Sequence, residues 1–317
     1  MQLGVYGSGY LATVMSACLA DFGLPVTCFD EDATAIGALA EGKMPFHERN
    51  LQEVVRRNAR AGRLLYSWEL TSVPARAQII FLACDSEQGI EELALKLGKL
   101  MNPAAVLAIV TPVQVGTADR IEGRLRTAGV KVTVVSHPVF LTPGCAVEDF
   151  NWPDRILLGT GVSEAVLQFK QVYRPLVMRG VPIIVTTRPT AELARQAASA
   201  FIATKISFIN EVAAICEHVK ADATDLSLAL GLDKRIGPRC LQPGTAMGGA
   251  FGFGDMDAIE QLAGRCGVSL KVLGAAREVS RDVCERLADK ISAAVETLPG
   301  KQVAMLGLAF KPNTNCV

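Results

Sequence analysis

A chain of 317 residues, half of them apolar, is long enough for two hydrophobic cores, so we expect two domains and part of a third. Its 32 basic side chains balance 32 acidic ones, which argues against nucleic acid or an anionic membrane surface as the main partner. Nine cysteines without a C-x-x-C pair, and only three histidines, indicate a reducing, cytoplasmic chain without a disulfide framework or a structural metal site.

The first thirty residues contain the most informative motif of the chain. A short apolar strand leads into Gly7-Ser8-Gly9-Tyr10-Leu11-Ala12, and a second strand after the following helix ends on Asp30. This is a dinucleotide fingerprint, in which Gly7 permits the tight turn, Gly9 leaves room for a pyrophosphate and Ala12 lets the helix approach the sheet. The Asp30 carboxylate is placed to accept hydrogen bonds from both ribose hydroxyls, and it would repel a 2′-phosphate. The sequence therefore predicts NAD, and not NADP, as the cofactor.

Two uncharged stretches could be mistaken for targeting or membrane segments. Residues 1–20 lack a basic leader region, and their glycines fall where a nucleotide-binding turn needs them. Residues 101–118 are interrupted by Pro103, Pro112 and Gly116, which is typical of a strand followed by a loop. We therefore expect a soluble chain.

Short apolar strands alternate with helices up to about residue 188. We expect strands over residues 2–6, 25–29, 79–83, 105–110, 132–136, 156–159 and 182–186. We expect helices over residues 33–41, 50–59, 87–100, 119–128 and 164–174. A near-continuous apolar run such as residues 79–83 is typical of a parallel sheet that is covered on both faces. The predicted fold class is α/β, with a doubly wound (Rossmann) parallel sheet at the N-terminus.

The pattern changes after residue 188. Residues 190–220 contain no proline or glycine and few charges, which predicts a helix of about 45 Å that must be covered on most sides. A second domain or a partner subunit could supply this cover. Further helices over 223–230, 256–263 and 270–298 complete an all-helical second region, and residues 302–307 read as a buried strand. A lone strand cannot bury its faces, so we expect a truncated third domain or a chain cut short. The predicted domains are residues 1–188, 189–298 and 299–317.

Five segments, in this order, resemble the UDP-glucose/GDP-mannose dehydrogenase family over the whole chain. They are the fingerprint at residues 7–12 and residues 151–155, 200–211, 233–237 and 306–311. The resemblance implies an NAD-binding N-terminal domain, a long central helix that builds a homodimer, and a C-terminal nucleotide-binding domain that would begin near Lys301. It also implies oxidation of the C6 alcohol of a sugar nucleotide, most often a UDP-sugar, to a carboxylate with two NAD per turnover.

The resemblance assigns residues to both ligands. Those implied at the cofactor are Gly7, Gly9, Tyr10, Leu11, Asp30, Ala83 and Thr111. Those implied at the sugar nucleotide are Phe140, Leu141, Arg235, Gly244, Gly248 and Gly249, of which Arg235 would reach the ligand across the dimer.

The catalytic groups of that family are replaced at most matching positions. The family loop GFGGSCFPKD corresponds to residues 246–255, where Phe251 stands at the thiol position and only Asp255 is retained. The lysine and asparagine of the long helix become Arg195 and Ser199, and arginine stays protonated, so it cannot serve as a base. The family's V-G-T-P turn becomes residues 84–87, Cys-Asp-Ser-Glu. Asp255 is therefore the one candidate catalytic residue.

Two functions remain open from the sequence. One is a nucleotide-sugar dehydrogenase with impaired activity, since losing one positioned group typically costs about 10²- to 10⁴-fold in rate. The other is a catalytically inactive pseudoenzyme that binds NAD or a sugar nucleotide and regulates or scaffolds. Cys240 or Cys145 could replace the missing thiol, but free cysteines in an apolar chain are usually inert. His137 is expected to make a structural hydrogen bond.

Overall fold

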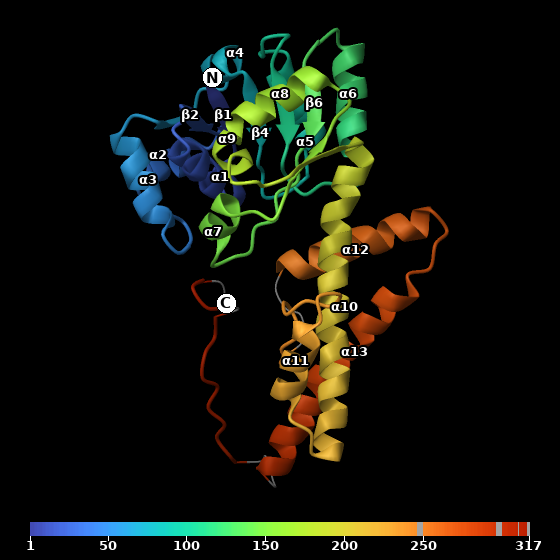
Figure 1. The fold of residues 1–317 in the computed structure, drawn as a ribbon. Helices are drawn as coiled ribbons and strands as arrows, with labels where there is room; N and C mark the ends of the chain where they lie inside the picture. The colour runs from blue at the N-terminus through green and yellow to red at the C-terminus, as the bar shows by residue number, and fades with distance from the viewer. Residues whose placement is uncertain (246–249, 296–299, 310, 316–317) are drawn as a thin grey trace. The chain divides into compact units, whose positions relative to one another are not determined.

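The computed structural model describes residues 1–245, 250–295, 300–309 and 311–315, with residues 250–253 described by their backbone alone. The chain forms two compact units (Figure 1). Unit 1 comprises Met1–Arg195 with Ala309–Val317, and unit 2 comprises Gln196–Leu308. The division into domains at residues 188 and 298 stays a prediction.

Unit 1 is built on an eight-stranded sheet in the order β3-β2-β1-β4-β5-β6-β7-β8. The strands are β1 (Leu3–Tyr6), β2 (Val26–Phe29), β3 (Leu64–Ser67), β4 (Ile79–Leu82), β5 (Val106–Ile109), β6 (Thr133–Ser136), β7 (Ile156–Gly159) and β8 (Ile183–Thr186). The first six are parallel, which confirms the predicted Rossmann-type architecture. The last two strands, β7 and β8, run parallel to each other, and β7 pairs with β6 antiparallel. Antiparallel neighbours need no helical crossover, and the chain from β6 to β7 carries only a six-residue helix.

Both faces of the sheet are covered, because alternate strand residues point to opposite sides. Ile79 and Phe81 of β4 pack into one core, and Ile80 and Leu82 pack into the other. The first core is closed by α1 (Tyr10–Asp21), α2 (Ala33–Ala40), α3 (Leu51–Arg60), α7 (Ala146–Asn151), α8 (Ser163–Val172) and α9 (Arg174–Val177). The second is closed by α4 (Ser72–Arg76), α5 (Ile90–Gly98) and α6 (Thr117–Thr127). Burial on both faces explains the continuous apolar runs of the central strands.

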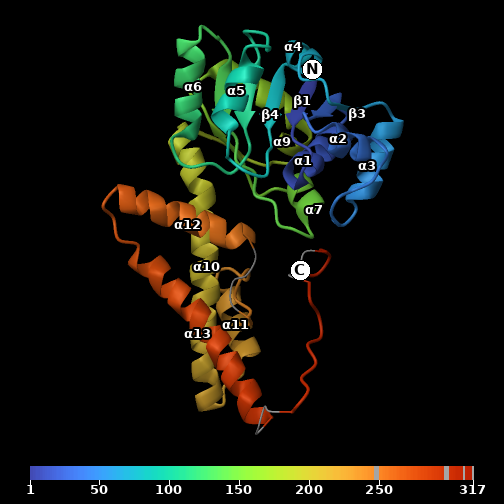
Figure 2. The same cartoon turned by 180° about the vertical axis from the view of Figure 1, so that it is seen from behind.

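Unit 2 is helical, as the sequence predicts. Its elements are the main part of α10 (Arg188–Val219), α11 (Ala223–Leu232), α12 (Ala250–Arg265) and α13 (Lys271–Ala294), which are seen from the opposite side in Figure 2. Ala203, Met256 and Leu273 form a small core between three of these helices. The buried Ser207 Oγ donates to the Ala276 carbonyl over 2.7 Å, which ties α10 to α13.

Helix α10 is the one helix, among the residues that the structure describes, that is long and apolar enough to cross a membrane. This follows from its length and composition alone. Its buried polar side chains include Gln196, Ser207 and Asn210, which is typical of a helix that packs against protein.

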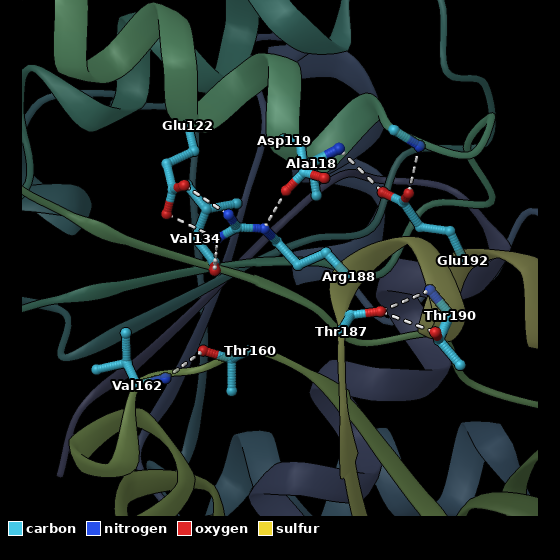
Figure 3. Close-up of polar contacts among 11 residues, drawn as sticks. Ala118, Asp119, Glu122, Val134, Thr160, Val162, Thr187, Arg188, Thr190 and Glu192 are labelled. Carbon is cyan, nitrogen blue, oxygen red and sulfur yellow. Dashed lines mark hydrogen bonds and ion pairs between the residues drawn. The ribbon is translucent and has the colours of Figure 1, made fainter.

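The first turns of α10 belong to unit 1 and are tied to α6 by charged groups (Figure 3). Arg188 Nε pairs with Asp119 over 2.6 Å, and its Nη1 donates to Glu122 over 2.6 Å. The buried Glu192 carboxylate accepts from the backbone N–H groups of Gly116 and Ala118 at the start of α6, over 2.6 and 2.9 Å. Burial raises the pKa of Glu192, and the two N–H groups oppose that shift.

The strand expected over residues 302–307 is absent from the described structure. Residues 300–309 have no strand pairing, and their side chains are exposed, with Leu306 at 94%. A single extended segment finds no neighbour for its backbone groups, so the apolar composition alone does not make it a strand. Residues 311–315 belong to unit 1, where Asn315 accepts from the His47 backbone N–H over 2.9 Å.

Candidate functional site

The predicted dinucleotide turn is present between β1 and α1. Gly7 has φ +130°, and a Cβ at this position would lie 2.6 Å from the Ala83 carbonyl oxygen and 3.0 Å from the Ala12 Cβ. Only glycine fits this conformation and this space. The turn therefore brings Ala83, at the end of β4, directly against the start of α1.

Asp30 lies at the end of β2 and is already oriented. Its Oδ2 accepts from Ser8 Oγ over 2.9 Å, and its Oδ1 accepts from the Asp32 backbone N–H over 3.1 Å. Ser8 belongs to the glycine turn, so the turn and the acidic residue hold each other in place. Glycine turn and carboxylate meet at the carboxyl edge of the sheet, where dinucleotides bind in this architecture.

Three further residues implied at the cofactor have structural roles. The Tyr10 hydroxyl donates to Glu48 over 2.5 Å, and Leu11 packs against the first core. Thr111 Oγ1 donates to the Leu82 carbonyl over 3.1 Å and accepts from the Cys84 N–H over 2.8 Å. The Thr111 hydroxyl thus joins the ends of β4 and β5, close to the glycine turn.

Asp85 also lies at the glycine turn, although it was not among the predicted site residues. A Cβ on Gly9 would overlap the Asp85 carboxylate, whose atoms are the three nearest to that position. Burial raises the pKa of Asp85, as does the nearby Asp30, while a hydrogen bond from the Tyr10 backbone N–H lowers it. A sequence indication existed, because Asp85 replaces the glycine of the family's V-G-T-P turn. The Asp85 carboxylate therefore fills the space beside Gly9 at the start of α1.

The segment after β6 holds two residues implied at the sugar nucleotide. The Arg155 guanidinium carbon lies 3.9 Å from the centre of the Phe140 ring, and Leu141 packs against the first core. Arg195 Nη1 donates to the Val139 carbonyl over 2.5 Å. Within unit 1, the residue at the family's lysine position thus contacts the backbone of the segment next to Phe140.

His137, at the start of this segment, makes the structural contacts that we expected. The ring is buried between the Leu157 carbonyl, 2.9 Å from Nδ1, and the Tyr173 hydroxyl, 2.7 Å from Nε2. Burial lowers the pKa of His137 to about 4. A neutral ring donates through Nδ1 to the carbonyl and accepts at Nε2 from the Tyr173 hydroxyl.

Ser199 and Asp255 come together in unit 2. Ser199 Oγ on α10 donates to Asp255 Oδ2 on α12 over 2.7 Å, and Asp255 is buried. The side chain of Phe251, together with Gly248 and Gly249, lies outside the described residues. The retained carboxylate of the catalytic loop is thus engaged by the residue at the family's asparagine position.

The remaining substrate-side residues of unit 2 lie in the loop between α11 and α12. Lys205 Nζ fixes this loop by donating to the carbonyls of Ile236 and Arg239 over 3.1 and 2.7 Å. The exposed Arg235 pairs with Asp233 over 2.6 Å. The Gly244 N–H donates to Asn210 Oδ1 over 3.0 Å.

The structure describes the surroundings of Cys145 and Cys240, the two cysteines that could replace the missing thiol. Cys145 is the N-cap residue of α7, and Cys240 is exposed with φ +63°. Burial raises the pKa of Cys84, next to Asp85, to about 11, so this group stays a thiol at neutral pH.

Comparisons with known proteins cover nearly the whole chain. Residues 1–177 match the family model of the UDP-glucose/GDP-mannose dehydrogenase NAD-binding domain, and residues 189–282 match that of the central domain. The chain is 35% identical to a UDP-glucose 6-dehydrogenase of Rhizobium meliloti (strain 1021), over 99% of this chain and 76% of the relative. It is 35% identical to UDP-glucose 6-dehydrogenase YwqF of Bacillus subtilis (strain 168), over 99% of this chain and 74% of the relative.

Solved structures show the same similarity. A UDP-glucose dehydrogenase from the archaeon Pyrobaculum islandicum superposes with a TM-score of 0.91 at 29% identity, over 100% of this chain and 76% of that one. A GDP-mannose dehydrogenase from Pseudomonas aeruginosa shares the fold, with a TM-score of 0.67 at 22% identity over 92% of this chain and 71% of that one.

Proposed function

Because the chain belongs to the UDP-glucose/GDP-mannose dehydrogenase family, we propose that it is an NAD-binding nucleotide-sugar dehydrogenase in which oxidation of the sugar C6 alcohol is impaired. NAD is the cofactor, and when bound it accepts the hydride that leaves the alcohol carbon. Gly7 and Asp30 of this chain would hold its adenosine end. A sugar nucleotide is the substrate class that family membership supports, and we propose a UDP-sugar.

The hydrogen bond from Ser199 to Asp255 is the observation that carries the proposed impairment. A base has to accept the alcohol proton, and Asp255 is the retained acidic group. Its Oδ2 already accepts from Ser199 over 2.7 Å. Arg195 stays cationic and donates to the Val139 carbonyl, so it can stabilise an oxyanion but cannot accept a proton. With Phe251 at the thiol position, the second oxidation lacks the nucleophile that captures the aldehyde.

The contrast between the retained cofactor turn and the replaced catalytic groups favours a second candidate, a pseudoenzyme that binds NAD or a sugar nucleotide in a regulatory or scaffolding role. Its glycine turn and its oriented Asp30 are retained, whereas the groups that perform chemistry are replaced. Absorbance at the NADH band, recorded with NAD and a panel of UDP-, GDP- and TDP-sugars, separates the two. Slow NADH formation with one sugar supports the impaired enzyme. Binding heat in calorimetry without NADH supports the pseudoenzyme, and rapid uronate formation would contradict both.

A homodimer is part of the proposal, and exposed apolar side chains on α10 support it. Phe201, Phe208 and Ile215 recur every seven residues and are 66%, 53% and 59% exposed, so they line one face of the helix. The exposed Arg235 fits a residue that reaches a ligand across a dimer. Light scattering after size-exclusion chromatography should give twice the chain mass, and Phe208→Lys should yield monomers. A monomeric wild-type protein would contradict this part.

We also propose a cytoplasmic location. The described cysteines are all free, which is the usual state in a reducing compartment.

A further inference from the structure

The Asp85 side chain lies in the space that Gly9 leaves open at the start of α1. The three atoms nearest to a Cβ on Gly9 would be the carboxyl carbon and both oxygens of Asp85. In a dinucleotide-binding fold, the second glycine of the fingerprint is there so that backbone and pyrophosphate can approach each other. The carboxylate therefore sits where an anionic ligand group has to go.

Asp85 is held in this place by the same type of contact that holds a phosphate. The Tyr10 backbone N–H donates to its carboxylate. Helix α1 has Gly9 as its N-cap, without a side-chain cap, and it has no acidic residue in its first turn. The N-terminal N–H groups of a helix attract negative charge, and here the loop after β4 supplies it.

A second negative charge close to Asp85 makes it unfavourable for Asp85 and a diphosphate to occupy this space together. Asp30 is close enough to Asp85 to raise its pKa. Glu31 follows Asp30 and pairs with Lys96. The other ionisable groups near the turn include Tyr6, Tyr10 with its partner Glu48, and the thiols of Cys28 and Cys84. If a diphosphate entered while Asp85 was in place, its oxygens would contact the carboxylate oxygens of Asp85. The negative charges of the two groups would also repel each other.

We propose that the Asp85 carboxylate occupies the pyrophosphate subsite of the NAD site and has to leave it before NAD binds, so that Asp85 lowers the affinity for NAD. This inference rests on the NAD site of the proposed function. A site that is open for only a fraction of the time binds its ligand more weakly by that fraction. The hydrogen bond from the Tyr10 N–H to the charged Asp85 carboxylate favours the form in which Asp85 fills the subsite. We therefore expect this form to reduce the affinity for NAD about tenfold or more.

Calorimetric titration of NAD into the wild type, Asp85→Gly and Asp85→Asn tests the inference without relying on turnover. Asp85→Gly should bind NAD at least about tenfold more tightly than the wild type. Asp85→Asn removes the charge and keeps the shape, so its affinity should lie between the two. Glu164→Gln removes an exposed carboxylate from the first turn of α8 and should leave NAD affinity unchanged.

Adenosine is the second probe, because it carries the ribose that Asp30 recognises and has no phosphate. Its affinity should be equal in the wild type and Asp85→Gly. Equal NAD affinity in the wild type and both Asp85 variants overturns the inference, as does a gain for adenosine as large as that for NAD. Absence of NAD binding in all three proteins overturns it as well. The missing thiol is tested separately by NADH formation, so either proposal can fail without the other.

Discussion

Ser199 Oγ lies 2.7 Å from Asp255 Oδ2, and this hydrogen bond joins α10 to α12 within unit 2. Asp255 is buried, so its carboxylate needs donors from the protein. The hydrogen bond thus contributes a polar contact between two helices of unit 2.

Ser199→Ala should therefore destabilise the protein. The substitution removes one donor from a buried carboxylate, which costs about 1–3 kcal/mol of the free energy of unfolding. Urea denaturation followed by circular dichroism measures the loss. Ser292→Ala is the control, because that exposed hydroxyl bonds only to the Ala288 carbonyl of its own helix. An unfolding midpoint of Ser199→Ala equal to that of the control would show that the bond contributes nothing.

Phe251→Cys alone should not restore uronate formation. The thiol would return, but Arg195 and Ser199 would still replace two positioned groups, each worth about 10²- to 10⁴-fold in rate. Adding Arg195→Lys and Ser199→Asn in the same chain should give measurable NADH with a sugar nucleotide, and the single variant should give none above the wild type. Robust activity of the single variant would show that the other replacements matter little.

His137 should make the protein less stable as the pH falls below about 6.5. The folded state holds the ring neutral, with its pKa lowered to about 4 by burial, whereas the unfolded chain takes up a proton near the ordinary value of about 6.5. Stability from this group is complete above pH 6.5 and declines toward pH 4, by a total on the order of 3 kcal/mol.

Urea titrations from pH 7 to 4.5 measure this decline against His137→Gln, which keeps a polar side chain and cannot titrate there. The wild type should lose stability more steeply than the variant, by up to about 1.4 kcal/mol per pH unit. Proton NMR gives an independent check, because the His137 ring signals should not shift between pH 7 and 5. A titration midpoint near 6.5 in the folded protein would contradict the prediction.

The sequence predicts elements well where burial is continuous and poorly where it is not. The strand at residues 156–159 is found with the predicted bounds, and the other predicted strands of the sheet differ by one residue at one or both ends. The edge strand β3 was missed because it is half exposed, with Leu65 at 54%, and its apolar run is only three residues long. The short helices α4, α7 and α9 were missed because each has only four to six residues.

The candidate site likewise contains residues that the sequence predicts and residues that it does not. The glycine turn and Asp30 could be predicted, because backbone geometry imposes residue types at fixed spacing. The positions of Asp85 and Glu48 could not, because they depend on loops that come from distant parts of the chain. Periodicity and spacing describe local structure, whereas these carboxylates are placed by tertiary contacts.

Glu48→Gln should destabilise the region around the glycine turn. The buried Glu48 carboxylate accepts from the Tyr10 hydroxyl over 2.5 Å and from the N–H groups of Gly144 and Ala146 over 2.8 and 3.1 Å. It thereby caps α7, whose N-cap residue provides no side-chain bond, and fixes the first residue of α1. A glutamine presents an NH₂ group to at least one of these donors, so one contact becomes repulsive and the rest lose their charge.

We expect this substitution to lower the free energy of unfolding by about 2–3 kcal/mol, a value typical of hydrogen bonds to a charged group. Thermal unfolding of Glu48→Gln should be compared with Glu53→Gln, an exposed carboxylate in the nearby first turn of α3. Amide hydrogen exchange locates the effect, since the N–H groups of Gly144 and Ala146 should exchange faster in Glu48→Gln alone. Equal exchange rates at these two amides in both variants would contradict the role of Glu48, because their protection depends on the carboxylate that accepts from them.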